Sequence, residues 1–189
     1  MNYTEDWFSE NIVKFKNLIP HYSSFSCRLL EIGSFEGRSS NWFAENFCQN
    51  EGSKLTCIDT FMGSWEHSST QTDNLYERFL ENTRSNSNKI RVIREGSEFA
   101  LPNLLKSGER FDFIYVDGNH TFDAVMCDAI YSHQLLTPGG IVIFDDYGWG
   151  LDKTPSLIPH HAINAFLSIH RDEYDVIGFD YQVALQKKL

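Results

Sequence analysis

The chain has 189 residues, 41% of them hydrophobic, and a formal net charge of −10. This length suits a single domain over residues 1–189, and the apolar content excludes an intrinsically disordered chain. The acidic balance disfavours nucleic acid and anionic membranes as partners. The sequence has neither the apolar region of a signal peptide nor an apolar run long enough to cross a bilayer, so we expect a cytoplasmic protein.

Predicted helices and strands alternate along the chain. In the first half we expect an N-terminal extension over 1–26 that carries a helix over 5–19, then a short apolar strand over 28–33 that ends in glycine, a helix over 39–47, a strand over 54–60, an irregular polar segment over 61–74 and a helix over 74–82. In the second half we expect a strand over 89–93, a short helix up to 105, a strand over 111–116, a helix over 121–136, a turn at 138–140, a strand over 141–144, a loop over 147–157, a helix over 158–170 and two strands over 174–178 and 181–186.

Several of these strands are continuous apolar runs, which is typical of a parallel sheet covered by helices on both faces. The last two strands follow one another closely and are expected to pair as an antiparallel hairpin. The sequence therefore predicts an α/β fold. We expect a Rossmann-like, doubly wound, mostly parallel seven-stranded sheet with an antiparallel C-terminal hairpin at one edge.

Acidic residues stand at or near the ends of four predicted strands. They are Glu31, Asp59, Asp117 and the pair Asp145-Asp146. In a parallel sheet all carboxyl ends lie on one side, and ligands of open α/β sheets bind outside those ends. Clustered carboxylates repel one another unless a cation or hydrogen bonds compensate. The pattern therefore indicates one functional site, assembled from four separated segments.

A glycine turn joins the first strand to the following helix, with Gly33 and Gly37 at a G-x-x-x-G spacing. Glycine allows the backbone to pass close to a ligand. The spacing is neither the G-x-G-x-x-G dinucleotide fingerprint nor a phosphate-binding loop. Asp59, which ends the second strand, can accept both ribose hydroxyls of an adenosine ligand.

Five segments occur in order at the separations of a known family: LLEIGSFEGRSS, CIDTF, REGSEFALPNL, FIYVDGNH and GGIVIFDDY. Together they resemble class I S-adenosylmethionine-dependent methyltransferases. The likeness is greatest to the macrocin-type sugar O-methyltransferases and weaker to catechol O-methyltransferase. It covers roughly residues 27–150.

The resemblance implies a role for each matching residue. In the cofactor site, Glu31, Gly33, Ser34 and Gly37 would line the methionine part, Asp59 would bind the ribose, Thr60 and Phe61 would flank the adenosine, Gly96 and Ser97 would meet the adenine end, and Asp117 would contribute as well. In the acceptor site, Asp117, Asp145 and Asp146 would hold a divalent metal, with Asp117 also counted as catalytic, and His120 would act as the general base. Catechol-type enzymes carry Asp-Asn where this chain has Asp145-Asp146, and they use a lysine as the base where this chain offers His120. This departure speaks against a catechol as the acceptor.

The predicted reaction is methyl transfer from S-adenosylmethionine to a hydroxyl group of a small molecule, either a sugar or a natural product. Mg²⁺ would bind the acceptor oxygen as a Lewis acid, and His120 would take the proton. Acceptor selectivity would come from the loops over 61–74 and 147–157. Trp149 could stack on an acceptor ring, and Trp65 could cover the cofactor or the substrate. A homodimer, in which a partner subunit completes the pocket, is a further expectation.

Plainer interpretations stay open beside these. Asp117 could cap a turn, one of the Asp145-Asp146 pair could cap a helix or loop, and His120 could be a solvated loop residue. At the level of the whole protein, one alternative is a nicotinamide-dependent oxidoreductase on a similar sheet. Another is a non-catalytic protein that binds the cofactor.

Overall fold

The computed structural model describes residues 1–22 and 24–189, with the side chains of 19 and 20 left undescribed. Its sheet has seven strands in the order β3-β2-β1-β4-β5-β7-β6. The strands are β1 (Arg28–Ile32), β2 (Lys54–Ile58), β3 (Ile90–Ile93), β4 (Phe111–Val116), β5 (Leu136–Phe144), β6 (Tyr174–Phe179) and β7 (Val183–Lys187). Strands β1 to β5 are parallel, and β7 is antiparallel to both β5 and β6. This arrangement confirms the predicted fold class, including the C-terminal hairpin.

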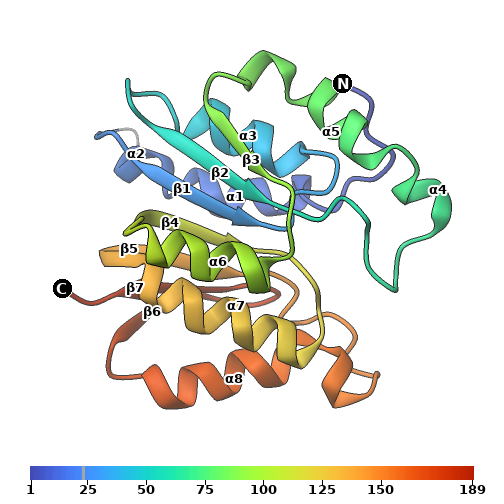
Figure 1. Ribbon diagram of the computed structural model, residues 1–189. Coiled ribbons are helices and arrows are strands. Elements are labelled where there is room, and N and C mark those ends of the chain that lie inside the picture. Colours follow the sequence, from blue (N-terminus) through green and yellow to red (C-terminus); the bar gives the residue numbers. More distant parts are fainter. Residues whose placement is uncertain (23) are drawn as a thin grey trace.

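The order of the sheet places a topological switch between β1 and β4 (Figure 1). The chain moves outward from β1 through β2 to β3, then returns to the other side of β1 as β4 and β5. Loops leaving the carboxyl ends of β1 and β4 therefore turn to opposite sides and leave a crevice between them.

Helices cover both faces of the sheet (Figure 1). On one face lie α6 (Ser97–Lys106), α7 (Phe122–Leu135) and α8 (Pro159–His170). On the other lie α1 (Ile12–Lys16), α3 (Arg38–Asn46) and α5 (Leu75–Asn82). The remaining short helices are η1 (Ser9–Asn11), α2 (Ile19–Tyr22), α4 (Ser69–Thr72), η2 (Arg84–Asn86) and η3 (Pro155–Leu157).

Alternate residues along each central strand feed two separate cores. In β1, Leu30 and Ile32 face α6, α7 and α8, whereas Leu29 faces the helices on the other side. Apolar side chains on both faces explain why these strands read as continuous apolar runs.

The second core is dominated by aromatic side chains that anchor the N-terminal segment. Phe15 of α1 lies 5.3 Å from Phe43 of α3 and 5.6 Å from Tyr115 of β4, measured between ring centroids. Phe8 lies 5.4 Å from Phe15. Such pairs contribute about 0.5–1.5 kcal/mol beyond their buried area. The predicted extension is thus packed onto the sheet.

The N-terminal helix is shorter and more broken than its periodicity predicts. Instead of one helix over 5–19, the chain forms η1, α1 and α2 in succession. The prediction that the helix stops before Pro20 was wrong, because α2 includes this residue in its first turn. A proline is tolerated there, since the first amides of a helix have no intrahelical partner.

Two further segments differ from expectation. The polar segment over 61–74 contains α4, which Ser68 and Gln71 begin with reciprocal capping contacts. The turn expected at 138–140 lies within β5, where the register with β4 shifts and Gly139 has a φ of +78°. Only glycine adopts that backbone conformation without strain.

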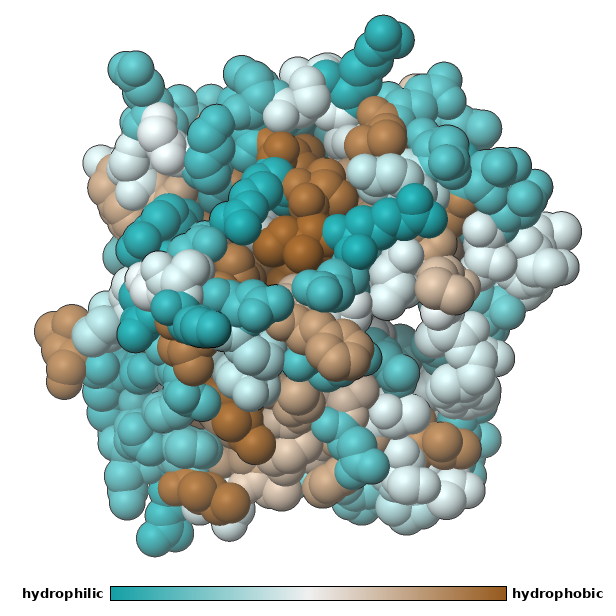
Figure 2. All heavy atoms as spheres, viewed as in Figure 1, coloured by the Kyte–Doolittle hydropathy of each residue, from teal (hydrophilic) through white to brown (hydrophobic). Residues whose placement is uncertain are grey.

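Polar side chains cover most of the face seen in Figure 2, with apolar side chains in smaller patches between them. Within the described residues, no helix combines the length and the apolar character needed to cross a membrane.

Candidate active site

A cleft of about 1400 Å³ opens at the carboxyl ends of the parallel strands. The structure brings together there most of the residues that the sequence singled out: Gly33, Ser34, Asp59, Thr60, Gly96, Ser97, Asp117, His120, Asp145 and Asp146. The remaining three, Glu31, Gly37 and Phe61, do not line it. They lie in or behind the loops that do, and each has a structural task.

Glu31 is fully buried beneath the glycine turn. Its carboxylate accepts a 2.8 Å hydrogen bond from the hydroxyl of Ser34 and a close one from the hydroxyl of Ser40. Burial raises the pKa of Glu31 above its usual value, although the serine hydroxyls oppose that shift. Glu31 therefore fixes Ser34 and the start of α3 from below.

Gly37 begins α3 with a φ of +81°. A Cβ atom there would lie 2.6 Å from the methyl group of Thr83. The glycine is therefore required by backbone conformation and by packing between the turn and α5's C-terminal end. Phe61 likewise packs away from the cleft, 4.9 Å from both Tyr76 and Phe79 between ring centroids.

Asp59 holds the loops after β1 and β2 together. Its Oδ2 accepts hydrogen bonds from the backbone amides of Ser34 and Phe35, at 2.8 and 2.9 Å. Its Oδ1 accepts one from the amide of Phe61 at 2.7 Å. A carboxylate offers about four acceptor positions, so these three bonds leave about one toward the cleft. We expected Asp59 to accept hydrogen bonds from both ribose hydroxyls, but in this structure it has room for about one further hydrogen bond.

Backbone strain gathers around this edge of the sheet. Among the residues that the structure describes, four non-glycine residues have a positive φ, and three of them, Phe35, Phe61 and Asp146, lie in the loops after β1, β2 and β5. Such conformations cost of order 1–3 kcal/mol each and persist where the surroundings impose them. At Phe35 and Phe61, the hydrogen bond from the backbone amide to Asp59 helps to hold the strained conformation.

The second part of the cleft is a cluster of Asp117, His120 and Asp146. Their potential ligand atoms all lie within 4.8 Å of one another. Nε2 of His120 lies 2.9 Å from Oδ2 of Asp146, and its Nδ1 lies 3.2 Å from the carboxylate of Glu66. Burial alone would lower the pKa of His120, but the hydrogen bonds and charges of Asp146 and Glu66 outweigh it and raise the pKa to about 10. In this arrangement His120 is therefore protonated and bridges the carboxylates of Glu66 and Asp146.

Asp145, predicted as a metal ligand, lines the cleft, but its carboxylate accepts hydrogen bonds from groups within the protein. Its Oδ2 accepts a 2.8 Å hydrogen bond from Gln182 and a close one from the hydroxyl of Tyr115. Its Oδ1 accepts the backbone amide of Asp146 at 2.8 Å. The φ of +56° at Asp146 turns the chain between the two acids. Of the pair, only Asp146 joins the close cluster with Asp117 and His120.

The donor set fits a divalent cation. Burial raises the pKa of Asp117 well above its usual value, and the charges of Asp145 and Asp146 raise it further. Carboxylates crowded in this way are relieved by a bound cation. Asp117 and Asp146 supply the oxygen ligands that Mg²⁺ prefers, and His120 could ligate only after losing its ring proton.

A family model described as a methyltransferase domain matches residues 30–147, well over half of the chain. The chain belongs to the methyltransferase domain family. The matched range runs from β1 to the residue after Asp146, so it includes the cleft-lining residues that follow β1, β2, β3 and β4 and the Asp145-Asp146 pair after β5. Membership of this family decides against the nicotinamide-dependent oxidoreductase as an alternative.

Individual relatives of this methyltransferase are distant in sequence. Uncharacterized protein R132 of Acanthamoeba polyphaga mimivirus is 26% identical over 170 residues, covering 87% of this chain and 71% of that protein. The structure is similar to an O-methyltransferase from Bacillus cereus in complex with SAH, with a TM-score of 0.69, 16% identity, and coverage of 98% of this chain and 84% of the other. It is also similar to MycE, from the mycinamycin biosynthetic pathway, in complex with Mg, SAH and mycinamycin VI, with a TM-score of 0.66, 15% identity, and coverage of 99% and 51%. At these identities the two structures bear on the fold alone.

Several residues of the methyltransferase cleft escaped the sequence analysis. Glu66, which clamps His120, lies 54 positions away in a loop whose sequence carries no recognisable motif. The N-terminal segment forms a wall of the cleft through Glu5, Trp7 and Asn11. Its apolar spacing indicated a helix but not what that helix would cover.

The two loops expected to govern selectivity meet across the cleft. Trp65 and Trp149 lie 6.2 Å apart between ring centroids, and Trp149 lies 4.8 Å from His120. The ammonium group of Lys153 lies 5.1 Å from the centre of the Trp149 ring. Aromatic faces and a cation therefore flank the Asp117–His120–Asp146 cluster.

Proposed function

We propose that this methyltransferase transfers a methyl group from S-adenosylmethionine to a hydroxyl oxygen of a small molecule, a sugar or a natural product, with the help of a divalent cation. The observation that carries the proposal is the shared cleft. Asp59, an acid suited to the ribose, and the cluster around Asp117, which is suited to a cation, open into the same 1400 Å³ space. Cofactor and activated acceptor could therefore meet there.

The loops after β1, β2 and β3 are suited to the cofactor. Asp59 is held rigid by three backbone amides, so its remaining acceptor position is fixed before a ribose hydroxyl arrives. Gly96 and Ser97 line the cleft at the start of α6, after β3, and an adenine ring could lie against them. The net negative lining of the cleft suits the positive sulfonium.

Asp117 and Asp146 are suited to a cation, with Mg²⁺ as the proposed ion. Such an ion, when bound, supplies Lewis acidity that lowers the pKa of an acceptor hydroxyl. Glu66 and Asp146 hold His120 beside the proposed cation site, with Nδ1 facing the carboxylate of Glu66 and Nε2 facing that of Asp146. His120 can act as a base only when it is neutral, so we propose that it takes the acceptor proton once the charge of Asp146 is compensated.

Trp65, Trp149 and Lys153 are suited to the acceptor. Flat aromatic faces pack against sugar and other ring systems, and their burial contributes to binding without fixing which hydroxyl reacts. MycE, a neighbour by fold, is described in complex with Mg, SAH and mycinamycin VI, which supports the same combination of ligands here.

The test is formation of S-adenosylhomocysteine by the purified protein, supplied with S-adenosylmethionine, Mg²⁺ and a panel of hydroxylated sugars and natural products. We expect turnover that is abolished by chelation and by Asp117→Asn, while this variant retains its affinity for S-adenosylmethionine. Cofactor binding without turnover, and without any metal bound at millimolar Mg²⁺, would favour a non-catalytic binding protein. The cytoplasmic location and a homodimer that completes the pocket remain proposals, testable by fractionation and by light scattering.

A further inference from the structure

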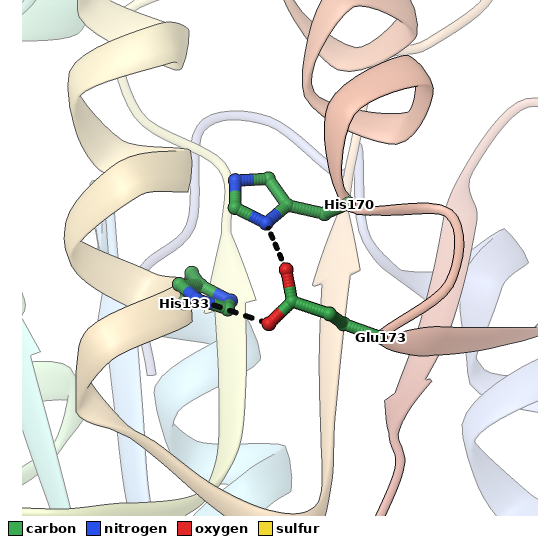
Figure 3. A group of neighbouring side chains, drawn as sticks. All are labelled: His133, His170 and Glu173. Carbon is green, nitrogen blue, oxygen red and sulfur yellow. Dashed lines mark hydrogen bonds and ion pairs between the residues drawn. The ribbon is translucent and has the colours of Figure 1, made fainter.

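A second group of potential ligands lies at the opposite end of the parallel strands from the cleft. It consists of His133, His170 and Glu173, whose ligand atoms all lie within 4.8 Å of one another (Figure 3). His133 is in the last turn of α7, His170 is the last residue of α8, and Glu173 precedes β6. None of the three belongs to the cleft described above.

The register of the hairpin fixes this position. Tyr174, which follows Glu173, pairs with Lys187, whereas the cleft end of β5, at Phe144, pairs with Val183 at the other end of β7. The group therefore lies near the amino ends of the parallel strands. A ligand bound here would not meet the proposed substrates.

Glu173 lies beside the two imidazoles and bridges them through its carboxylate (Figure 3). Its Oε1 is 2.6 Å from Nδ1 of His170, and its Oε2 is 3.7 Å from Nε2 of His133. The two rings are 4.4 Å apart between centroids. One carboxylate thus points both of its oxygens at ring nitrogens that could donate lone pairs to the same ion.

The other nitrogen of His133 has a partner of its own. Nδ1 lies 3.0 Å from the hydroxyl oxygen of Tyr174, which is buried. That oxygen can accept the Nδ1–H proton and leave the Nε2 lone pair free. A second contact that fixes the tautomer and ring orientation is characteristic of histidine ligands.

The surroundings suit a cation reached from solvent. The last turns of α7 and α8 both meet at this point, and the carbonyl ends of helices favour positive charge. Lys187 supplies a positive charge that would compete with a bound cation, but its ammonium group donates a 2.6 Å hydrogen bond to the backbone carbonyl of His133. The side chain of Glu173 is 51% exposed, so it can move to close around an ion.

We propose that His133, His170 and Glu173 form a binding site for a divalent transition-metal ion of the Zn²⁺ type, separate from the methyl-transfer cleft. Two imidazoles and one carboxylate with an open fourth position suit Zn²⁺, whereas Mg²⁺ prefers oxygen ligands alone. Tetrahedral Zn²⁺ sites place ligand atoms roughly 3.4 Å apart. To reach this spacing, the 2.6 Å contact between Glu173 and His170 would lengthen and the 3.7 Å contact between Glu173 and His133 would shorten. The ion would join α7, α8 and β6 at the end of the molecule remote from the cleft.

The test uses Asp146→Asn as the parent protein, because this change weakens the cation cluster in the cleft. Asparagine also tolerates the positive φ at this position. After treatment with a chelator, Zn²⁺ is titrated in competition with a chromophoric chelator, and Co²⁺ is added separately for its absorption spectrum. We expect one Zn²⁺ per chain, a rise in melting temperature, and a Co²⁺ spectrum of low coordination number.

Adding His170→Ala or Glu173→Gln to the parent is expected to lower the Zn²⁺ affinity at least tenfold and to remove the Co²⁺ spectrum. His161→Ala, an exposed histidine on the same helix, is the matched control and should change neither. Circular dichroism of the metal-free variants checks that they are folded. The proposal is overturned if the parent binds no Zn²⁺, or if His170→Ala and Glu173→Gln bind it as the parent does.

Discussion

The carboxylate of Glu36 accepts two 2.7 Å hydrogen bonds from Thr4, one from its backbone amide and one from its hydroxyl. Glu36 is buried, and the Nε of Arg78 lies 3.1 Å from it. The glycine turn that faces the cleft is thereby tied to the N-terminal segment and to α5. This contact places Glu5 and Trp7 over the cleft, although 32 positions separate Thr4 from Glu36.

We predict that Glu36→Ala destabilises the protein by about 3–5 kcal/mol, because it leaves a charged Arg78 without its buried partner. Thr4→Val removes one hydroxyl hydrogen bond and should cost about 1 kcal/mol. Denaturant unfolding of the two variants measures both effects. Equal effects from the two changes would contradict the view that Glu36 mainly compensates Arg78.

Gly33 is predicted to be intolerant of any side chain. Its φ is +85°, and a Cβ atom would lie 1.9 Å from the carbonyl oxygen of Asp117. Gly33→Ala must therefore push apart the ends of β1 and β4, where Asp117 enters the cleft. We expect a loss of thermal stability together with loss of cofactor and metal binding. Gly108→Ala is the control, because its φ is also positive but nothing lies within 4 Å of its Cβ position.

His120 and Glu66 are predicted to act as a pair in turnover. If His120 removes the acceptor proton, His120→Ala should lower kcat by roughly 10²–10⁴-fold, the range of general base catalysis. Glu66→Gln keeps the hydrogen bond but loses the charge, so we expect a smaller decrease. Steady-state kinetics with a saturating acceptor separates these effects from acceptor affinity. Unchanged kcat in His120→Ala would place the base elsewhere.

Asp128 is predicted to make stability depend on pH. It is buried in α7, and burial is the main cause that raises its pKa to about 7. A folded-state pKa above the unfolded value means that this group favours the folded state only when protonated, so its contribution is lost as pH rises from about 4 to 7. Asp128→Asn should gain up to about 4 kcal/mol over the wild type above pH 7, and little at pH 4.

Denaturant unfolding of the wild type and Asp128→Asn at a series of pH values measures this difference. A stability gap that widens between pH 4 and 7 and is then constant agrees with the prediction. Parallel stability curves would mean that Asp128 titrates normally in the folded protein.

The sequence predicted the strands and the convergence of their acidic ends for one physical reason. Parallel strands buried on both faces read as apolar runs, and their carboxyl ends must share one edge. Asp59 and Asp117 could therefore be placed in the same site without any knowledge of the loops. The family resemblance added roles to residues that this rule had already gathered.

Other features depend on contacts that no local pattern encodes. Which of Asp145 and Asp146 joins the cluster with Asp117 and His120 is set by a positive φ at Asp146 and by the hydrogen bonds that Tyr115 and Gln182 donate to Asp145. Glu66 reaches His120 only because the loop after β2 folds back across the cleft. Apolar periodicity also does not predict the break in the N-terminal helix, because tertiary packing of Phe8 and Phe15 decides the path of that segment.

The central claim is that Asp59 holds a nucleoside cofactor in the cleft, and calorimetric titration of S-adenosylmethionine tests it most directly. We predict saturable one-to-one binding to the wild type and at least tenfold weaker binding to Asp59→Asn. Asp73→Asn, an exposed acid outside the cleft, serves as the control and should bind as the wild type does. The account is contradicted if the wild type does not bind S-adenosylmethionine, or if folded Asp59→Asn binds it with undiminished affinity.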